Sequence, residues 1–396
     1  MKHSTDRILT THVGSLVRPP DVAEIMRGRE AGQPFNEAEL ATLKREVASV
    51  VRMEAECGID IPSDGEFSKS SFSGYVSDRL TGFETRPAER SLLARSRDRT
   101  RFTEAYAELD RPLPSGAMGG GAGMTAAFGP AVCVGPITYK GQALVENDIA
   151  TFKAALQGQD FAEAFIPAVG PATIELQRRN EYYKTQEEYV FAIAEAMKTE
   201  YKMIVDAGFI LQIDDPRLTT EYDSLDPAPS LEDYRKFLAL RIEALNGALA
   251  GLPQDRIRYH ICWGSWHGPH TTDLPLKDFV DIILKVRADA FSLEAANARH
   301  AHEYHVWEDV KLPEGTMLIP GVISHTTNCV EHPELVAERL MNYAKLVGRE
   351  NVIAGTDCGF AQGAFTQRVH PSIMWEKLRM LSEGARLASQ RLWNGS

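Results

Sequence analysis

Short apolar, β-branched segments recur along the chain, and longer stretches with helical periodicity lie between them. This alternation is typical of repeated βα units, which build a parallel sheet with helices packed on it. Eight segments have the composition of strands: Ile8–Ser15, Ile59–Glu66, Glu163–Gly170, Phe209–Asp214, Ile257–Cys262, Ala290–Glu294, Met317–Ile323 and Val352–Asp357. The periodicity predicts helices over Glu37–Cys57, Gln186–Ala207, Leu231–Ala250, Leu276–Ala288, Pro333–Val347 and Pro371–Leu392.

Eight such units predict an α/β fold, the (β/α)8 or TIM barrel, as one catalytic domain over residues 1–396. The alternative is a doubly wound sheet, but no G-x-G-x-x-G motif joins a strand to a helix. A long insertion at residues 75–130 follows the second predicted strand and includes a glycine-rich stretch at 116–123. We expect it to be a solvated loop, a lid or a subunit-contact arm. With a strand at Ala131–Thr138 in a hairpin, residues 75–138 would stand on the barrel rim.

The composition indicates which binding partners and which cellular compartment to expect. The formal net charge is −12, and Lys and Arg do not cluster with aromatic residues, so we expect no nucleic-acid partner. We also expect no membrane association and a cytoplasmic location, because no signal-peptide core and no apolar stretch of roughly 20 residues is present. The five cysteines are widely spaced and odd in number, which disfavours a disulfide framework and suits a reducing compartment.

Polar residues gather where the predicted strands end. In a (β/α)8 barrel these carboxyl ends share one face, where the loops build the active site. The segments are Gly14-Ser15, Asp64-Gly65-Glu66, Gly170-Pro171, Asp214-Asp215, His260-Ile261-Cys262, Glu294, Ser324-His325 and Asp357-Cys358. We therefore expect the chemistry of the protein at this face.

Four of these residues form a candidate metal site. His260 and Cys262 alternate on one strand, so both side chains can point at the same ion. Glu294 ends the next strand, and Cys358 ends the last one. Two thiolates, one imidazole and one carboxylate form a tetrahedral set suited to zinc. Because the ligands come from three strands, the pattern indicates a reactive rather than a structural zinc site.

The ordered motifs resemble the catalytic half of cobalamin-independent methionine synthase and its shorter single-barrel relatives, in the superfamily that also contains uroporphyrinogen decarboxylase. The resemblance covers nearly the whole chain. It rests on Thr11-His12-Val13-Gly14-Ser15, Asp64-Gly65-Glu66, Gly170-Pro171-Ala172-Thr173, Leu211-Gln212-Ile213-Asp214-Asp215-Pro216, His260-Ile261-Cys262, Glu294 and Asp357-Cys358-Gly359.

The resemblance implies a zinc-dependent methyl or alkyl transferase that activates a thiol substrate as a zinc thiolate, with homocysteine and methionine as the first hypothesis. It makes His260, Cys262, Glu294 and Cys358 the zinc ligands, Glu294 being the one that the substrate weakens or displaces. Ser15, Glu66 and Asp214 would hold the amino-acid thiol, and we place His12 with these substrate-binding residues. Paired carboxylates suit an ammonium group, and Ser15 with nearby backbone N–H groups suits a carboxylate.

A proton donor is needed if the leaving group departs as an amine or alkoxide. His325 is the candidate for this catalytic role, because the family carries its proton-donating histidine at the end of the same strand. His12 and the histidines of residues 299–305 are further candidates. Most of that second group would be solvated or would support other residues.

The sequence leaves the alkyl donor open. The family's folate-stacking tryptophan follows the Gly-Pro-x-Thr motif, and residues 174–177 here contain no aromatic side chain. The loop Trp263–His270 sets two indoles beside the predicted metal, where they would either contact an apolar or cationic donor or simply pack. A zinc-dependent epoxide–thiol transferase, or a thioether lyase, is the alternative; a metal-free decarboxylase-like or ligand-binding barrel is a third hypothesis. A homodimer is possible for a barrel of this size.

Overall fold

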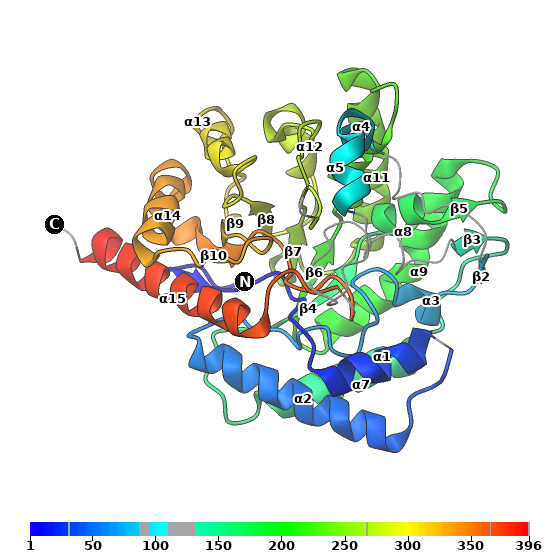
Figure 1. The fold of residues 1–396 in the computed structure, drawn as a ribbon, viewed down its shortest axis with the longest axis horizontal. Helices are drawn as coiled ribbons and strands as arrows, with labels where there is room; N and C mark the ends of the chain where they lie inside the picture. The colour runs from blue at the N-terminus through cyan, green and yellow to red at the C-terminus, as the bar shows by residue number, and fades with distance from the viewer. Residues whose placement is uncertain (31, 87–95, 110–130, 267, 365, 395–396) are drawn as a thin grey trace.

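The computed structural model describes residues 1–396 except 31, 87–95, 110–130, 267, 365 and 395–396. Its centre is a curled, seven-stranded parallel sheet in the order β1-β10-β9-β8-β7-β6-β4 (Figure 1). The strands are β1 Leu9–Thr10, β4 Phe165–Val169, β6 Ile210–Asp214, β7 Ile257–His260, β8 Ala290–Glu294, β9 Met317–Ile323 and β10 Ile353–Thr356. From β4 to β10 the neighbours follow chain order, so the sheet lacks the reversal that defines a doubly wound fold.

The segment predicted as the second strand does not form one. Residues 59–66 contribute an isolated parallel bridge between Ile61 and Thr11. Pro62 has no N–H to give to a ladder, and Gly65 and Glu66 have positive φ, so the extended conformation ends early. The segment still lies between the two sheet edges. The Ile61 amide donates to the Thr10 carbonyl at 3.0 Å, and the Pro62 carbonyl accepts from the Phe165 amide at 3.0 Å.

Helices cover the outside of the sheet, and most predicted ones form within two residues of their expected bounds. The longest are α2 Glu37–Glu56, α9 Gln186–Asp206, α11 Leu231–Ala248, α14 Pro333–Val347 and α15 Pro371–Trp393. The stretch predicted as one helix at Leu276–Ala288 contains only η3 Leu276–Asp278 and α12 Val280–Ile283. The helices that were not predicted include α1 Pro20–Glu30, α7 Gln142–Leu156, α8 Pro171–Gln177 and α10 Arg217–Ser224. No helix in the described ranges is long and apolar enough to cross a membrane.

A second, small sheet lies apart from the first. It joins β2 Phe83–Thr85, β3 Ala131–Cys133 and β5 Arg179–Asn180, with β2 and β3 antiparallel. The strand predicted at Ala131–Thr138 is therefore shorter than expected. Between β2 and β3 the structure describes α4 Arg97–Arg101 and α5 Thr103–Leu109. The glycine-rich stretch at 116–123 lies outside the described residues.

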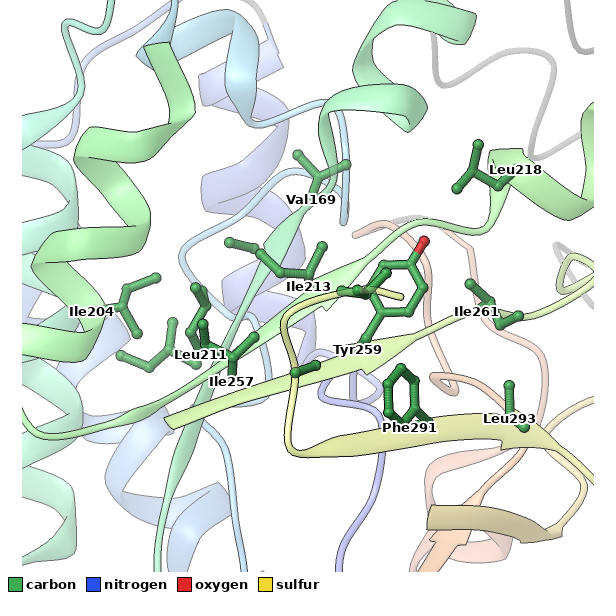
Figure 2. Close-up of a cluster of buried hydrophobic side chains, with 14 of the residues drawn as sticks. Val169, Ile204, Leu211, Ile213, Leu218, Ile257, Tyr259, Ile261, Phe291 and Leu293 are labelled. Carbon is green, nitrogen blue, oxygen red and sulfur yellow. The ribbon is translucent and has the colours of Figure 1, made fainter. Parts of the chain in front are cut away.

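Successive side chains of each strand point alternately to the outer and the inner face of the curled sheet. Leu211, Ile213, Ile257, Tyr259 and Phe291 belong to the core between the sheet and its helices (Figure 2). The residues between them point to the inside of the curled sheet. At one end, the inside is filled by a separate apolar cluster of Leu9, Ile61, Phe165, Ile210, Ala290, Met317, Ile319 and Ile353. Nearer the carboxyl ends, the inward positions are polar.

Candidate metal centre and its pocket

Three of the predicted metal ligands meet at the carboxyl ends of the strands. His260 is the last residue of β7, Cys262 follows two positions later, and Cys358 lies two positions beyond β10. One potential ligand atom from each residue lies within 4.8 Å of the other two, and all three side chains are buried. Among the described residues this is the one cluster of at least three His, Cys, Asp or Glu side chains close enough to share an ion.

The surroundings of His260 determine which of its ring nitrogens is available to bind a metal. Its Nδ1 lies 3.1 Å from the Ser292 hydroxyl on the adjacent strand β8. Its Nε2 is buried and has no hydrogen-bond partner in the described part of the chain. A buried imidazole nitrogen is rarely left without a partner, and a metal ion is one partner that would satisfy it. A neutral imidazole and two cysteine sulfurs are donors that zinc prefers, so these residues fit that metal.

The two sulfurs lie 3.4 Å apart, and this contact changes the acidity of both thiols. The hydrogen bond from Cys262 lowers the pKa of Cys358 well below the usual thiol value, and the nearby His260 and His325 act in the same direction. The same contact, together with burial, raises the pKa of Cys262. Ser265 donates a further hydrogen bond to the Cys358 sulfur at 3.1 Å. The geometry therefore favours negative charge on Cys358.

A pocket opens beside the three residues. The predicted substrate residues Ser15, Glu66 and Asp214 line it together with His260, Cys262 and Cys358. The structure thus brings six of the predicted site residues to one cavity. Further lining residues are Val13, Phe72, Gln177, Pro216, Arg217, Thr220, Gly264, Ser265, Trp266, Gly359, Gln362, Gly363 and Thr366.

Two carboxylates give the pocket an acidic side. Burial raises the pKa of Asp214 well above its usual value, and the charges of Glu66 and Cys358 add to the effect. Glu66 sits in a left-handed backbone conformation with φ of 60°, and its Oε2 is buried without a hydrogen-bond partner among the described residues. A cationic group of a ligand would lower the pKa of Asp214 and give Glu66 Oε2 a partner. The Ser15 hydroxyl donates to the carbonyl of Ala361.

Two other predicted residues do not line this pocket. Glu294 ends β8, where its Oε2 accepts a hydrogen bond from Asn297 at 3.0 Å, and it is not part of the three-residue cluster. His12 is buried with both ring nitrogens engaged, Nε2 with Glu54 and Nδ1 with the amide of Gly14 at 3.0 Å. His12 therefore shapes the turn before Ser15 and has no free nitrogen for a ligand.

His325 is buried next to this region and does not line the pocket either. Neither of its ring nitrogens has a hydrogen-bond partner among the described residues. Burial lowers the pKa of His325 to about 4, so the ring is neutral at pH 7.

The histidines after β8 divide into two groups. His302 and His305 are exposed, whereas His300 is buried. His300 Nε2 lies 3.1 Å from Asp273 Oδ2, and its Nδ1 lies 2.8 Å from Glu303 Oε2. The ring stacks on Trp263 with centroids 3.9 Å apart. This network supports the loop that follows Cys262.

Several residues of the site were not singled out from the sequence. Ser265 contacts Cys358, and Arg217 and Thr220 of α10 form part of the pocket wall. The position of Ser265 three residues after Cys262 was the available signal. Of the two indoles in that loop, Trp266 lines the pocket and Trp263 is fully buried. His267 lies outside the described residues.

Comparisons with known proteins identify the family of this chain. The family model for the catalytic domain of cobalamin-independent synthase matches residues 115–373. A methionine synthase of Thermococcus kodakarensis is 23% identical over 384 residues, covering 97% of this chain and 94% of the relative. A methionine synthase of Sulfolobus acidocaldarius is 25% identical over 353 residues, covering 88% of this chain and 85% of the relative.

Solved structures show the same fold. A B12-independent methionine synthase from Shewanella sp. W3-18-1, solved in complex with selenomethionine, superposes with a TM-score of 0.72 at 20% identity, covering 98% of this chain and 99% of that one. A putative vitamin-B12-independent methionine synthase of Listeria monocytogenes gives a TM-score of 0.64 at 20% identity, covering 96% of this chain and 98% of that one. The family model spans well over half of the sequence, and this chain therefore belongs to the cobalamin-independent synthase family, of which it carries the catalytic domain.

Proposed function

We propose that the protein is a zinc-dependent methyltransferase that converts homocysteine to methionine on a scaffold of the (β/α)8-barrel type. The observation that carries the proposal is the meeting of His260, Cys262 and Cys358 at one pocket with Ser15, Glu66 and Asp214. The first three residues suit a metal ion, and the other three suit the ammonium and carboxylate groups of an amino acid. The names of the methionine synthases reported above support the same reaction.

His260, Cys262 and Cys358 would hold the zinc ion, and Glu294 is the proposed fourth ligand. Zinc would supply one piece of chemistry, which is to lower the pKa of the substrate thiol so that it is ionised at neutral pH. Glu294 is buried and near Asp357 and Cys358. Burial and those charges raise its pKa, so this carboxylate gains from a nearby cation.

The protein residues would orient the substrate. Glu66 and Asp214 would pair with its ammonium group, because both are buried at the pocket and Glu66 Oε2 has no other partner in the described ranges. The substrate carboxylate would lie near Ser15. In the transfer, the sulfur electron pair forms the bond to the methyl carbon, and the donor leaves with the electrons of its own bond to that carbon. His325 is the proposed source of a proton for the leaving group; because its ring is neutral at pH 7 in the free protein, this role requires that substrate binding raises its pKa.

Metal content tests the first half of the proposal. Purified protein, dialysed against zinc and then against buffer, should retain about one zinc per chain, as expected for a site of this type. Cys358→Ala should lose most of the metal. Cys329→Ala is the matched control, because Cys329 is an exposed thiol away from the pocket. Wild-type protein that binds no zinc, yet forms product, would exclude this mechanism and leave a metal-free barrel.

Product analysis tests the second half. The zinc-loaded enzyme should form methionine from homocysteine and a methyl donor, and methyltetrahydrofolates of differing glutamate length are the first donors to try. Small epoxides with low-molecular-weight thiols form the parallel assay. A thioether from the epoxide without methionine from any donor would replace this proposal with an epoxide–thiol transferase.

A further inference from the structure

A polar layer lies inside the sheet directly beneath the pocket. Gln212 precedes Asp214 by two residues on β6, and Arg258 precedes His260 by two residues on β7, so these side chains share the inner face. Gln212 and Arg258 are register partners in the sheet. Both are essentially inaccessible, with exposed fractions of 0% and 1%. Neither contacts the proposed metal ligands through a hydrogen bond that the structure records.

Arg258 is a buried cation whose hydrogen-bond acceptors are all neutral. Its Nε donates to Gln212 Oε1 at 2.7 Å, and its two terminal nitrogens donate to the Thr11 hydroxyl at 3.0 Å and the His12 carbonyl at 2.8 Å. The guanidinium also lies over the Phe165 ring at 3.4 Å. A buried charge without a carboxylate partner costs stability, and an apolar side chain would fill the same volume more cheaply. The arrangement therefore calls for a role beyond packing.

The arginine determines which way the Gln212 amide points. A guanidinium can only donate, so Gln212 must turn its oxygen toward Arg258 and its NH₂ group the other way. That NH₂ group donates to Asp214 Oδ1 at 2.7 Å and to the Val13 carbonyl at 2.6 Å. Asp214 and Val13 both line the pocket, on segments that are far apart in sequence. One amide thus connects the Asp214 side of the pocket to the segment that leads to Ser15.

We propose that Gln212 and Arg258 are positioning residues that hold the Asp214 carboxylate for the ammonium group of an amino-acid thiol. This inference rests on the proposed function, because it concerns how that substrate is selected. Arg258 orients Gln212, and Gln212 fixes Asp214 Oδ1 while leaving Oδ2 for the ligand. The pair thereby makes the pocket prefer a thiol with an α-ammonium group over one without it.

Binding to the zinc-loaded enzyme tests the proposal without a methyl donor. The dissociation constants of homocysteine and of 4-mercaptobutyrate, which lacks the ammonium group, are measured by calorimetry. Gln212→Met keeps the length of the side chain and removes both donated bonds. It should weaken homocysteine binding by roughly 10- to 100-fold, the usual effect of losing a hydrogen bond to a charged group, and 4-mercaptobutyrate binding by less than about threefold. Arg258→Lys should act in the same direction.

The controls separate positioning from folding. Gln142→Met changes an exposed glutamine on α7 and should leave both dissociation constants as in the wild type. Zinc content and thermal midpoint are measured for every variant; if Gln212→Met does not fold, Arg258→Lys carries the test. Unchanged discrimination in a zinc-loaded, folded variant overturns the positioning role, as does equal weakening of both thiols. If the wild type itself binds the two thiols equally, the proposed substrate is wrong instead.

Discussion

His300 is the side chain that ties the loop after Cys262 to the helix region after β8. Burial acts to lower the pKa of His300, but its hydrogen bonds with Asp273 and Glu303 outweigh that effect and raise it to about 10. The imidazole is therefore charged at neutral pH. Because it also stacks on Trp263, a change in its charge would be felt next to the pocket.

This raised pKa predicts how stability depends on pH. The unfolded value is about 6.5, so the ion pairs contribute fully below pH 6.5 and their contribution is lost as pH rises toward 10. In His300→Gln, urea unfolding of the zinc-free protein should show a free energy of unfolding lower by roughly 1–3 kcal/mol at pH 6, with the difference shrinking by pH 10. Parallel pH curves for the two proteins would contradict a charged His300.

For single residues, the sequence predicted that His260, Cys262 and Cys358 lie together better than it predicted the role of each histidine. The alternation of His260 and Cys262 on a strand was enough to place both side chains on one face, because strand periodicity is local. The role of His12 could not be found this way, since its partner Glu54 lies on α2 and only the tertiary fold brings the two together. The zinc ligands and substrate residues remain predictions until the metal and the thiol are measured.

Among the elements, α14 and α15 pack most closely where α15 contains a glycine. A Cβ on Gly384 would come within 2.4 Å of the Val336 side chain and 3.0 Å of the Pro333 carbonyl. The two helices lie side by side along one edge of the molecule (Figure 1). Glycine here lowers helix propensity, and the close contact explains why it is present.

Gly384→Ala should therefore destabilise the protein. The helix-propensity gain of about 1 kcal/mol is smaller than the overpacking cost, so we expect a net loss of about 1–2 kcal/mol in urea unfolding. Gly247→Ala on α11 is the matched control, because a Cβ there meets no atom within 4 Å. That variant should be neutral or more stable than the wild type. A Gly384→Ala protein as stable as the control would mean that α14 shifts at no cost.

Strands and helices differed in how well the sequence predicted them. Seven of the eight predicted strands form, because buried parallel strands are short, continuous apolar runs. Residues 59–66 had the right composition, but Pro62 and the positive φ of Gly65 and Glu66 prevented a ladder. The stretch at Leu276–Ala288 was predicted as one helix, yet it forms only η3 and α12, and its β-branched residues lower its helix propensity.

For the whole molecule, the weakest part of the sheet should be the junction at residues 60–62. Four backbone hydrogen bonds connect it to its neighbours without forming a ladder: the Asp60 and Ile61 amides donate to the Thr10 carbonyl, the Ala162 amide to the Asp60 carbonyl, and the Phe165 amide to the Pro62 carbonyl. Every other neighbouring pair of strands is joined by a parallel ladder. The curled sheet should thus open at this junction before it opens elsewhere.

Amide hydrogen exchange measures this difference. The amides of Ile61 and Phe165 should exchange at least roughly tenfold faster than those of Phe291 and Ile319 in the central strands β8 and β9. Thiol ligand and zinc should slow all four amides without reversing their order, because the site lies at the opposite end of the strands from the inner apolar cluster. Equal protection at the junction and in the central strands would show a uniformly stable sheet.

The separation of the cluster residues along the chain has a consequence for biosynthesis. Cys358 lies 96 residues after Cys262, so a ribosome must add all of the residues between them before the two sulfurs can meet. An ion bound by all three side chains would then indicate that synthesis has passed residue 358. Truncated or stalled chains that end before residue 358 would carry His260 and Cys262 without Cys358. Their affinity for the metal would be lower than that of chains with all three residues.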